Sequence, residues 1–257
     1  DNAISQDQIV SYTIGSETES RTGEMELPVI LEDANISTSN DKAVQSQTVR
    51  FIIGEDIYVL RNVMAYTKVI DEANDFNYFV LNVEKSLAGI EGYFAVTKDI
   101  DMTGYEHAAH EFKAHPTYAG QSDIGFHGVF DGQGHVISNF DSISNGIFGN
   151  MTAPVIKNVA FTNVTLTKGT YPTLFAHSSR RDGWVDGKGY TKEALFENVY
   201  IEVDEINVNT GRVNVLVNNS FPTSSKLKNV VVEVAVTDEV LAKINANTLK
   251  VGTLAGN

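Results

Sequence analysis

The chain has 257 residues with an ordinary hydrophobic fraction of 42%, a formal net charge of −14 and no cysteine. The acidic balance disfavours binding to nucleic acid or to an anionic membrane surface, and the lack of cysteine excludes disulfides and thiolate chemistry. No apolar run is long enough to cross a membrane as a helix and no signal peptide is present, so we expect no membrane insertion and a mature or excised fragment.

Residues 1–64 are predicted to form a small β-rich unit. Strand character, mostly through alternation of apolar and polar side chains, is found at residues 9–14, 25–30, 48–53 and 57–60. The sequence Gly54-Glu55-Asp56 separates the last two segments and is a hairpin signal. Nothing in this unit has a catalytic pattern, so we expect a spacer or a lid for the residues that follow.

Residues 65–81 change to a helical period. One face of this segment is apolar, through Ala73, Phe76, Phe79 and Val80. Asp71 precedes the periodic run at the position where an N-cap is expected. We therefore predict a short amphipathic helix that covers the open N-terminal end of the next structural unit.

The stretch 126–150 joins an aromatic-rich strand, the turn DGQGH at residues 131–135 and a second strand. Two glycines within five residues indicate a tight turn with a positive φ at one or both of them. We expect Asp131 to accept backbone N–H groups in this turn and His135 to bond to a neighbouring repeat. A catalytic role for Asp131 and His135 is the alternative, but no serine or cysteine nucleophile accompanies them, so we favour the structural role.

Two kinds of short segment recur along the chain. The first kind reads apolar, polar, Asn, Val and then alternates, at residues 156–161, 196–201 and 227–232, with a looser copy at 137–140. The second kind is a run of small and apolar residues, at 146–150, 173–177, 214–218 and 252–257. The irregular spacing of the copies is typical of strands joined by variable loops. The pattern predicts a stacked β-solenoid in which each coil places one segment of each kind in a separate parallel sheet.

Asparagines recur at the predicted bends, where an Asn side chain bonds locally and tolerates left-handed backbone geometry. We predict that Asn139, Asn158, Asn198 and Asn229 stack as one ladder between coils. Ligand binding by these asparagines is the weaker interpretation, because buried polar side chains usually have a structural partner.

Three signatures within residues 65–257 resemble a known family. They are GYFAVTKDID at residues 92–101, FHGVFDGQGHVISNF at 126–140, and the small-residue repeat starts at 146–150 and 251–257. Together they resemble the repeat domains of bacterial surface proteins that carry the GLUG motif. The resemblance implies a right-handed parallel β-helix, similar in backbone to pectate lyases, in adhesins and large exoproteins. Residues 214–219 lack the glycines of the repeat, and residues 1–64 resemble no family.

We therefore predict an all-β fold, a right-handed parallel β-helix (solenoid) with an N-terminal capping helix over residues 65–257, preceded by the β-rich unit of residues 1–64. The C-terminal segment looks like the start of another repeat, so we expect truncation there and other domains of a longer chain. Residues 237–244, with Val240, Leu241 and Ile244 at helical spacing, are the only candidate for a terminal cap.

Other polar clusters carry weaker signals. Asp99 and Asp101 face one side of a strand and are placed to share a cation, but this segment lacks a complete calcium loop. His107 and His110 have a spacing suited to a metal only if their stretch is helical, and the sequence defines no further ligand. The acids cannot be sorted into the pair that glycoside hydrolysis needs. We therefore assign no catalytic residue, no metal ligand and no cofactor.

The loop at residues 177–192, HSSRRDGWVDGKGYTK, holds the only tryptophan of the chain. The aromatic faces of Trp184 and Tyr190 are suited to stacking on sugar rings, and Arg180 and Arg181 are suited to bonding hydroxyl groups. Loops on a rigid scaffold carry function disproportionately, so these four residues are candidate ligand-binding residues. Packing of Trp184 on the side of the solenoid is an equally open alternative.

These observations favour a non-catalytic extracellular module of a bacterial surface protein. It would serve as an adhesin stalk or as a surface that binds a host or microbial glycan or a surface protein. A polysaccharide-active enzyme (a lyase or glycoside hydrolase) on the same fold and a purely structural spacer are the alternatives. A groove with clustered carboxylates and one base would favour the enzyme, and a flat sheet bearing aromatic side chains would favour binding. The absence of both features would favour the spacer.

Overall fold

The computed structural model describes residues 11–14, 17–19, 46–53, 56–64, 66–83, 85–105, 125–143, 145–167, 172–176, 178–180, 182–185, 188–191, 193–209, 211–219 and 225–253. The strand predicted at residues 25–30 and the histidines predicted near a possible metal site, residues 107–115, lie outside these ranges.

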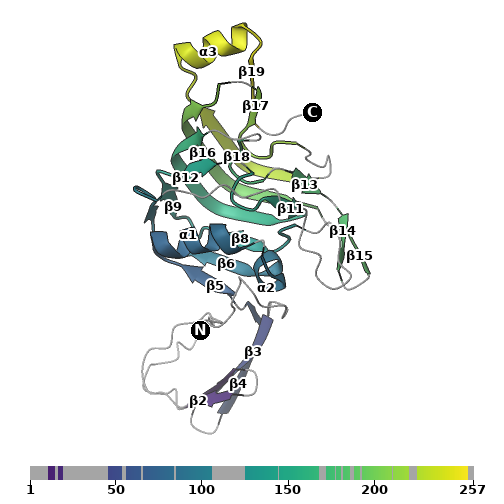
Figure 1. The fold of residues 1–257 in the computed structure, drawn as a ribbon. Helices are drawn as coiled ribbons and strands as arrows, with labels where there is room; N and C mark the ends of the chain where they lie inside the picture. The colour runs from purple at the N-terminus through teal and green to yellow at the C-terminus, as the bar shows by residue number, and fades with distance from the viewer. Residues whose placement is uncertain are drawn as a thin grey trace.

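The N-terminal residues contribute a separate antiparallel sheet with the strand order β2-β1-β3-β4. Its strands are β1 (Ser11–Ile14), β2 (Glu17–Glu19), β3 (Ser46–Ile53) and β4 (Asp56–Met64). The predicted hairpin is confirmed, because β3 and β4 pair antiparallel with Ile53 opposite Asp56. In Figure 1 this sheet lies beyond β5 (Lys68–Ile70), the N-terminal edge strand of the larger parallel sheet described next.

The remaining described residues are mostly β and are organised on a nine-stranded sheet in which every strand pair is parallel. Its main path runs β18-β16-β12-β8-β6-β5, and β7, β9 and β10 join it at the side. The strands are β5 (Lys68–Ile70), β6 (Tyr93–Val96), β7 (Ile100–Asp101), β8 (Val129–Asp131), β9 (Val136–Ser138), β10 (Asp141–Ile143), β12 (Val155–Thr167), β16 (Leu195–Asn207) and β18 (Lys226–Val234).

The Asn-Val segments lie side by side in this sheet, as their shared pattern predicts. Ile156 of β12 aligns with Phe196 of β16, which aligns with Leu227 of β18. Because the segments share one register, their apolar residues fall on one face of the sheet and their charged residues on the other.

The second kind of segment forms its own stack, apart from the Asn-Val strands. The Phe148 N–H donates to the Phe175 carbonyl (2.8 Å), the Phe175 N–H to the Leu216 carbonyl (3.2 Å), and the Leu216 N–H to the Thr253 carbonyl (3.2 Å). Short parallel pairs flank this stack: β11 (Asn150–Thr152) with β13 (Ser178–Arg180), and β17 (Gly211–Asn214) with β19 (Leu249–Gly252).

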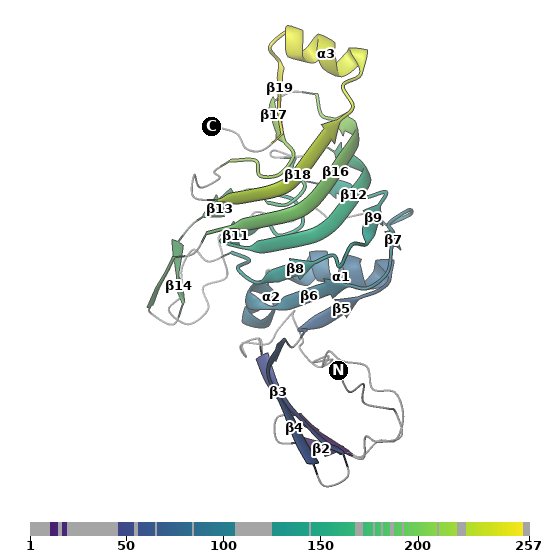
Figure 2. The same ribbon diagram turned by 180° about the vertical axis from the view of Figure 1, so that it is seen from behind.

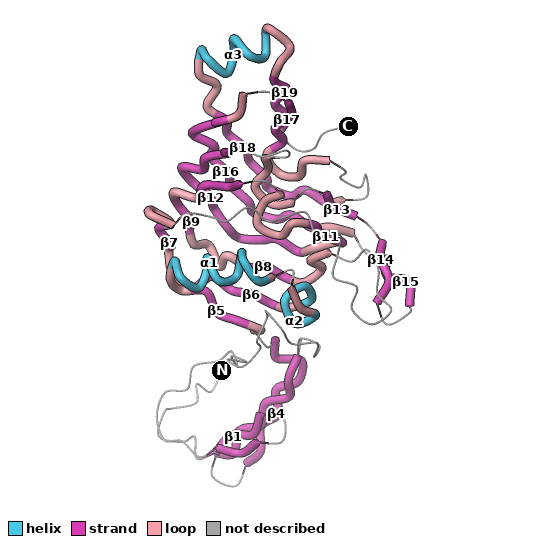
Figure 3. Tube along the Cα trace, in the orientation of Figure 1, coloured by secondary structure: helices cyan, strands magenta, loops and turns pink. Residues whose placement is uncertain are grey.

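Helices lie at the two ends of the parallel sheet (Figure 3). The predicted N-terminal helix is confirmed as α1 (Ala73–Asn82), and the short α2 (Leu87–Glu91) follows it. The predicted N-cap is wrong, because Glu72 occupies that position and the Asp71 carboxylate instead bonds Lys98 Nζ at 2.9 Å. No helix in the described ranges is long and apolar enough to cross a membrane.

Helix α3 (Asp238–Asn245) confirms the helical period predicted at residues 237–244. The Thr237 side chain caps it by accepting the Val240 N–H (3.3 Å). The chain then continues into β19, which pairs with β17, so α3 is a connection between strands rather than a terminal cap.

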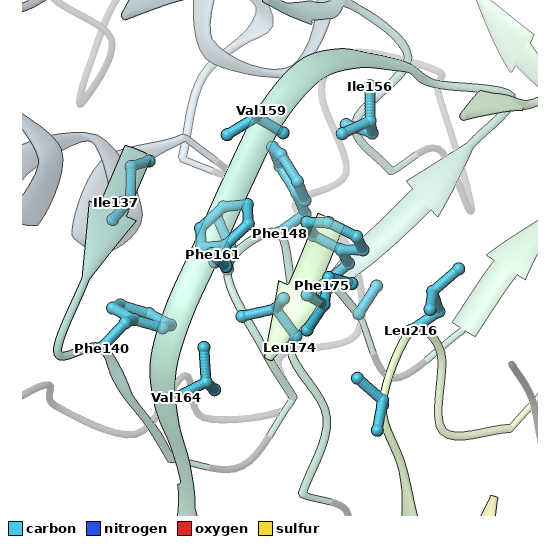
Figure 4. Packing of buried hydrophobic residues seen from close by; sticks show 14 of the residues in the cluster. Ile137, Phe140, Phe148, Ile156, Val159, Phe161, Val164, Leu174, Phe175 and Leu216 are labelled. Carbon is cyan, nitrogen blue, oxygen red and sulfur yellow. The ribbon is translucent and has the colours of Figure 1, made fainter. Parts of the chain in front are cut away.

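Stacked aromatic rings fill the space between the parallel sheet and the second stack. Among the phenylalanines whose burial the structure describes, ten are fully buried: Phe76, Phe79, Phe94, Phe126, Phe130, Phe140, Phe148, Phe161, Phe175 and Phe196. Figure 4 shows Val159 and Phe161 of β12 facing Phe148 and Phe175 from the second stack. The rings of Phe126 and Phe148 stack with centroids 4.4 Å apart. Helix α1 adds Phe76 and Phe79 to this cluster, which explains the apolar face of the helix.

Candidate functional site

The asparagines of the Asn-Val segments form a hydrogen-bonded ladder across the parallel sheet. Asn229 Nδ2 donates to Asn198 Oδ1 (3.1 Å), Asn198 Nδ2 donates to Asn158 Oδ1 (2.9 Å), and Asn158 Nδ2 donates to Asp131 Oδ1 (3.1 Å). The three asparagines have left-handed backbones, with φ values of 51°, 55° and 53°. The predicted ladder is therefore confirmed for these three residues, and Asp131 is its first member.

Asn139 does not belong to this ladder, which corrects the prediction. Its Nδ2 donates to Asp101 Oδ1 (2.7 Å), and its Oδ1 accepts a hydrogen bond from Asn163. The cause is the position of Asn139. It follows β9, which pairs with the middle of β12, whereas Asp131 ends β8, which pairs with the start of β12. A second ladder, Asp101–Asn139–Asn163, thus runs beside the first.

Asp131 is the most heavily bonded carboxylate on the face of the sheet away from the aromatic core. Its Oδ2 forms an ion pair with Lys157 Nζ (2.9 Å) and accepts a hydrogen bond from the Tyr93 hydroxyl (3.1 Å). Its Oδ1 accepts the Gln133 N–H (3.1 Å), which confirms the predicted role of Asp131 within the turn. Burial raises the pKa of Asp131, but Lys157, the Gln133 N–H and Asn158 outweigh it and lower this pKa below its usual value.

Tyr93 extends this cluster toward the start of the sheet. Its ring packs edge-to-face on Tyr66, with centroids 4.7 Å apart, and the Tyr66 hydroxyl accepts a hydrogen bond from Gln133 Nε2 (2.6 Å). Burial and the charge of Asp131 raise the pKa of the Tyr93 hydroxyl, so it remains a protonated donor. No sequence pattern pointed to Tyr93, Tyr66 or Lys157. The alignment of β6, β8 and β12 brings Tyr93 and Lys157 to Asp131, and Tyr66 joins the cluster through Tyr93 and Gln133.

The turn at residues 131–135 uses its two glycines differently. Gly134 has a φ of +89° with open space around it, as predicted for a positive-φ position. Gly132 is required for close approach, because a Cβ there would lie 2.5 Å from the Asn158 carbonyl oxygen. Gln133 also has a positive φ, 50°, which the sequence did not predict.

The predicted bond from His135 to a neighbouring repeat is confirmed. His135 Nδ1 lies 3.1 Å from Asp99 Oδ1, and the same oxygen accepts the Val136 N–H at 3.0 Å. The Val136 N–H, followed by His135, lowers the pKa of Asp99, and Asn139, followed by Thr103, lowers that of Asp101. The carboxylates of Asp99 and Asp101 therefore both accept hydrogen bonds from other groups of the protein.

A row of charges crosses the outer face of the sheet in register: Asp131, Lys157, Glu197 and Lys228. The signs alternate, and Lys228 Nζ lies 3.3 Å from Glu197 Oε1. Farther along the same strands, the Tyr200 hydroxyl donates to Glu233 Oε2 at 3.1 Å. Desolvation and the carboxylate of Glu233 raise the pKa of Tyr200. This face is therefore a polar surface on which aligned charges form ion pairs, as Asp131 does with Lys157 and Glu197 with Lys228.

The backbone of the predicted ligand-binding loop is an antiparallel hairpin of β14 (Asp182–Val185) and β15 (Lys188–Thr191). It stands out from the side of the parallel sheet (Figure 2). Trp184 lies on β14 opposite Gly189, Tyr190 lies on β15 opposite Gly183, and Arg180 ends β13. Arg181 lies outside the described residues, and the structure describes no side chain of this hairpin. The four candidates thus remain a prediction about binding.

The carboxylates of these polar clusters are bonded to other groups of the protein. Three carboxylates, Asp99, Asp101 and Asp131, have lowered pKa values and accept hydrogen bonds from protein donors, so they are poor general acids near neutral pH. Within the described ranges no group of three or more His, Cys, Asp and Glu side chains is placed to hold a metal ion.

Comparisons with protein families, with curated proteins and with solved structures give no match to this chain.

Proposed function

We propose that residues 65–257 form a right-handed parallel β-helix of the GLUG-motif class, with residues 1–64 as a separate β-rich unit. The large all-parallel sheet supports this proposal, as does the second stack of repeated segments hydrogen-bonded in the same order. The aromatic core between them is the interior expected of such a solenoid, and α1 covers its N-terminal end.

The function that follows is a non-catalytic extracellular module of a bacterial surface protein. The observation that carries it is the bonding of Asp131, because this carboxylate, which contacts both a lysine and a tyrosine, is bonded to Lys157, Tyr93 and the Asn ladder. A carboxylate held in this way stabilises the stack and is not free for proton transfer. The same observation argues against a polysaccharide lyase or glycoside hydrolase.

Binding is assigned to the hairpin of β14 and β15, which holds Trp184. A short ribbon that projects from a rigid stack is a suitable platform for ligand contact. A single aromatic platform gives weak binding, so affinity for an isolated glycan should be on the order of 0.1–1 mM, or roughly −4 to −5.5 kcal/mol. Such affinity becomes effective through multivalent display on a cell surface.

A glycan array followed by titration calorimetry tests this proposal. Trp184→Ala should abolish binding with little effect on folding, whereas Tyr78→Ala, which removes an aromatic ring 37% exposed on α1, should leave binding unchanged. Unaltered binding by the Trp184 variant would remove the hairpin from consideration. Turnover of a polysaccharide would support the enzyme, and wild-type protein that binds no glycan or surface protein would support the spacer.

A further inference from the structure

Strand β18 ends the parallel sheet. It pairs with β16 on one side, and no strand in the described ranges pairs with its other side (Figure 2). The chain continues through α3 into β19, which pairs with β17 instead. An unpaired edge presents backbone N–H and C=O groups that can accept another strand.

The core is incompletely covered at this edge. Leu227 of β18 is 37% exposed, whereas its neighbour Phe196 in β16 is fully buried. Val230 and Val232, which face inward on the same strand, are only partly buried against the core. An additional strand with apolar residues at the matching positions would cover these side chains.

The Asn ladder specifies the direction of such a strand. Each asparagine donates its Nδ2–H to the preceding member, so the last one, Asn229, donates to Asn198, and no described residue donates to Asn229 Oδ1. An asparagine on a strand added parallel to β18 would supply this donor. The ladder thus favours a parallel occupant that has Asn at this position.

The charge row specifies a second position. In the order Asp131, Lys157, Glu197, Lys228 the sign alternates at every strand, so the position beyond Lys228 favours an acidic residue. In a parallel register, that residue directly precedes the required asparagine. Strand β16 itself has this sequence, with Glu197 followed by Asn198 and Val199.

We propose that the free edge of β18 binds an extended polypeptide strand, parallel to β18, with the pattern apolar-Glu-Asn-Val-x-apolar. A second folded copy of this chain cannot supply β16 for this purpose, because both edges of β16 are already paired. The occupant is therefore a strand of this repeat type with unpaired edges, supplied from outside residues 1–257. This surface is distinct from the hairpin assigned to glycan binding, so each proposal is tested independently.

The probe is a labelled synthetic peptide with the sequence of residues 195–203, LFENVYIEV, titrated into the full chain and followed by fluorescence anisotropy. Two matched peptides replace its Asn by Ala or its Glu by Lys. We expect saturable binding of the parent peptide and at least about threefold weaker binding of each control, since one control loses an exposed amide hydrogen bond and the other replaces a charge attraction by a repulsion. Hydrogen exchange should slow at the amides of β18 when the peptide is bound.

Variants of the chain make the test specific. Lys228 is exposed, so Lys228→Glu should fold normally, bind the parent peptide weakly and regain affinity for the peptide with Glu replaced by Lys. Asn229→Gly retains the left-handed backbone but removes the acceptor, so it should weaken binding of the parent peptide and leave binding of the peptide with Asn replaced by Ala unchanged. Equal binding of all three peptides, or no saturable binding, would overturn the proposal. A dimer that Lys228→Glu dissociates in sedimentation would also overturn it, because a second copy would then occupy the edge.

Discussion

Replacement of Asn198 tests whether the Asn ladder stabilises the fold. Asn198→Ala removes one donated and one accepted hydrogen bond, together worth about 1–3 kcal/mol, and places a Cβ-bearing residue without a polar group at a φ of 55°. The left-handed backbone adds about 1–2 kcal/mol. Because Asn198 is exposed, water replaces part of the lost bonding, so we expect a loss of about 2–3 kcal/mol in the free energy of unfolding.

Equilibrium urea unfolding, followed by circular dichroism, measures this loss. Asn198→Gly relieves the backbone strain and should be less destabilising than Asn198→Ala. Asn207→Ala is the matched control, because Asn207 is exposed on the same strand and has neither a positive φ nor a place in the ladder, so its effect should stay within about 0.5 kcal/mol. Equal stability of the Asn198 and Asn207 variants would refute the reasoning. Unchanged stability with lost ligand binding would make the ladder a ligand site.

Four further variants test the cluster around Asp131. Gly132→Ala should lower the thermal midpoint more than Gly134→Ala, because only the first Cβ meets backbone, and equal shifts would contradict this. The Asp131 pKa is lowered on folding, so its stabilisation is present above its unfolded value of about 3.9 and is lost as the pH falls through the folded value. Asp131→Asn should therefore flatten the acid limb of a stability–pH curve. Tyr93→Phe should cost about 1.5–3 kcal/mol in urea unfolding, through loss of one hydrogen bond to a carboxylate, and an unchanged midpoint would argue against that bond.

Local patterns predicted the strands and the Asn-Val alignment well. In three segments an Asn is followed directly by Val. The Asn adopts the left-handed backbone of the bend and the Val points into the core, so the ladder through Asn158, Asn198 and Asn229 was predictable from the sequence. The assignment of Asn139 to it was wrong because that residue belongs to a different bend, and sequence spacing does not distinguish successive bends on one face.

The polar cluster at Asp131 was not predictable in full. Its partner Tyr93 lies 38 residues away in sequence, and the contact exists only through the registers of β6 and β8. The hydrogen bond within the turn, from the Gln133 N–H to the Asp131 carboxylate, was predictable because its two residues are only two positions apart. The prediction of Asp71 as the N-cap of α1 was wrong for a related reason. Its carboxylate bonds Lys98, which lies 27 residues farther along the chain.

The one-way donation of amide groups in the Asn ladder bears on how such a protein changes length in evolution. Each asparagine contacts only the members before and after it, so the ladder specifies no total number of repeats. Excision of residues 159–198 would bring Asn229 opposite Asn158, with the same donor, acceptor and apolar alignment as before. Gene duplication or deletion of one whole unit is thus structurally conservative, and a chain with that excision should still unfold cooperatively by circular dichroism. Deletion of half a unit would break the ladder and the aromatic core together, so selection should favour changes in whole repeats.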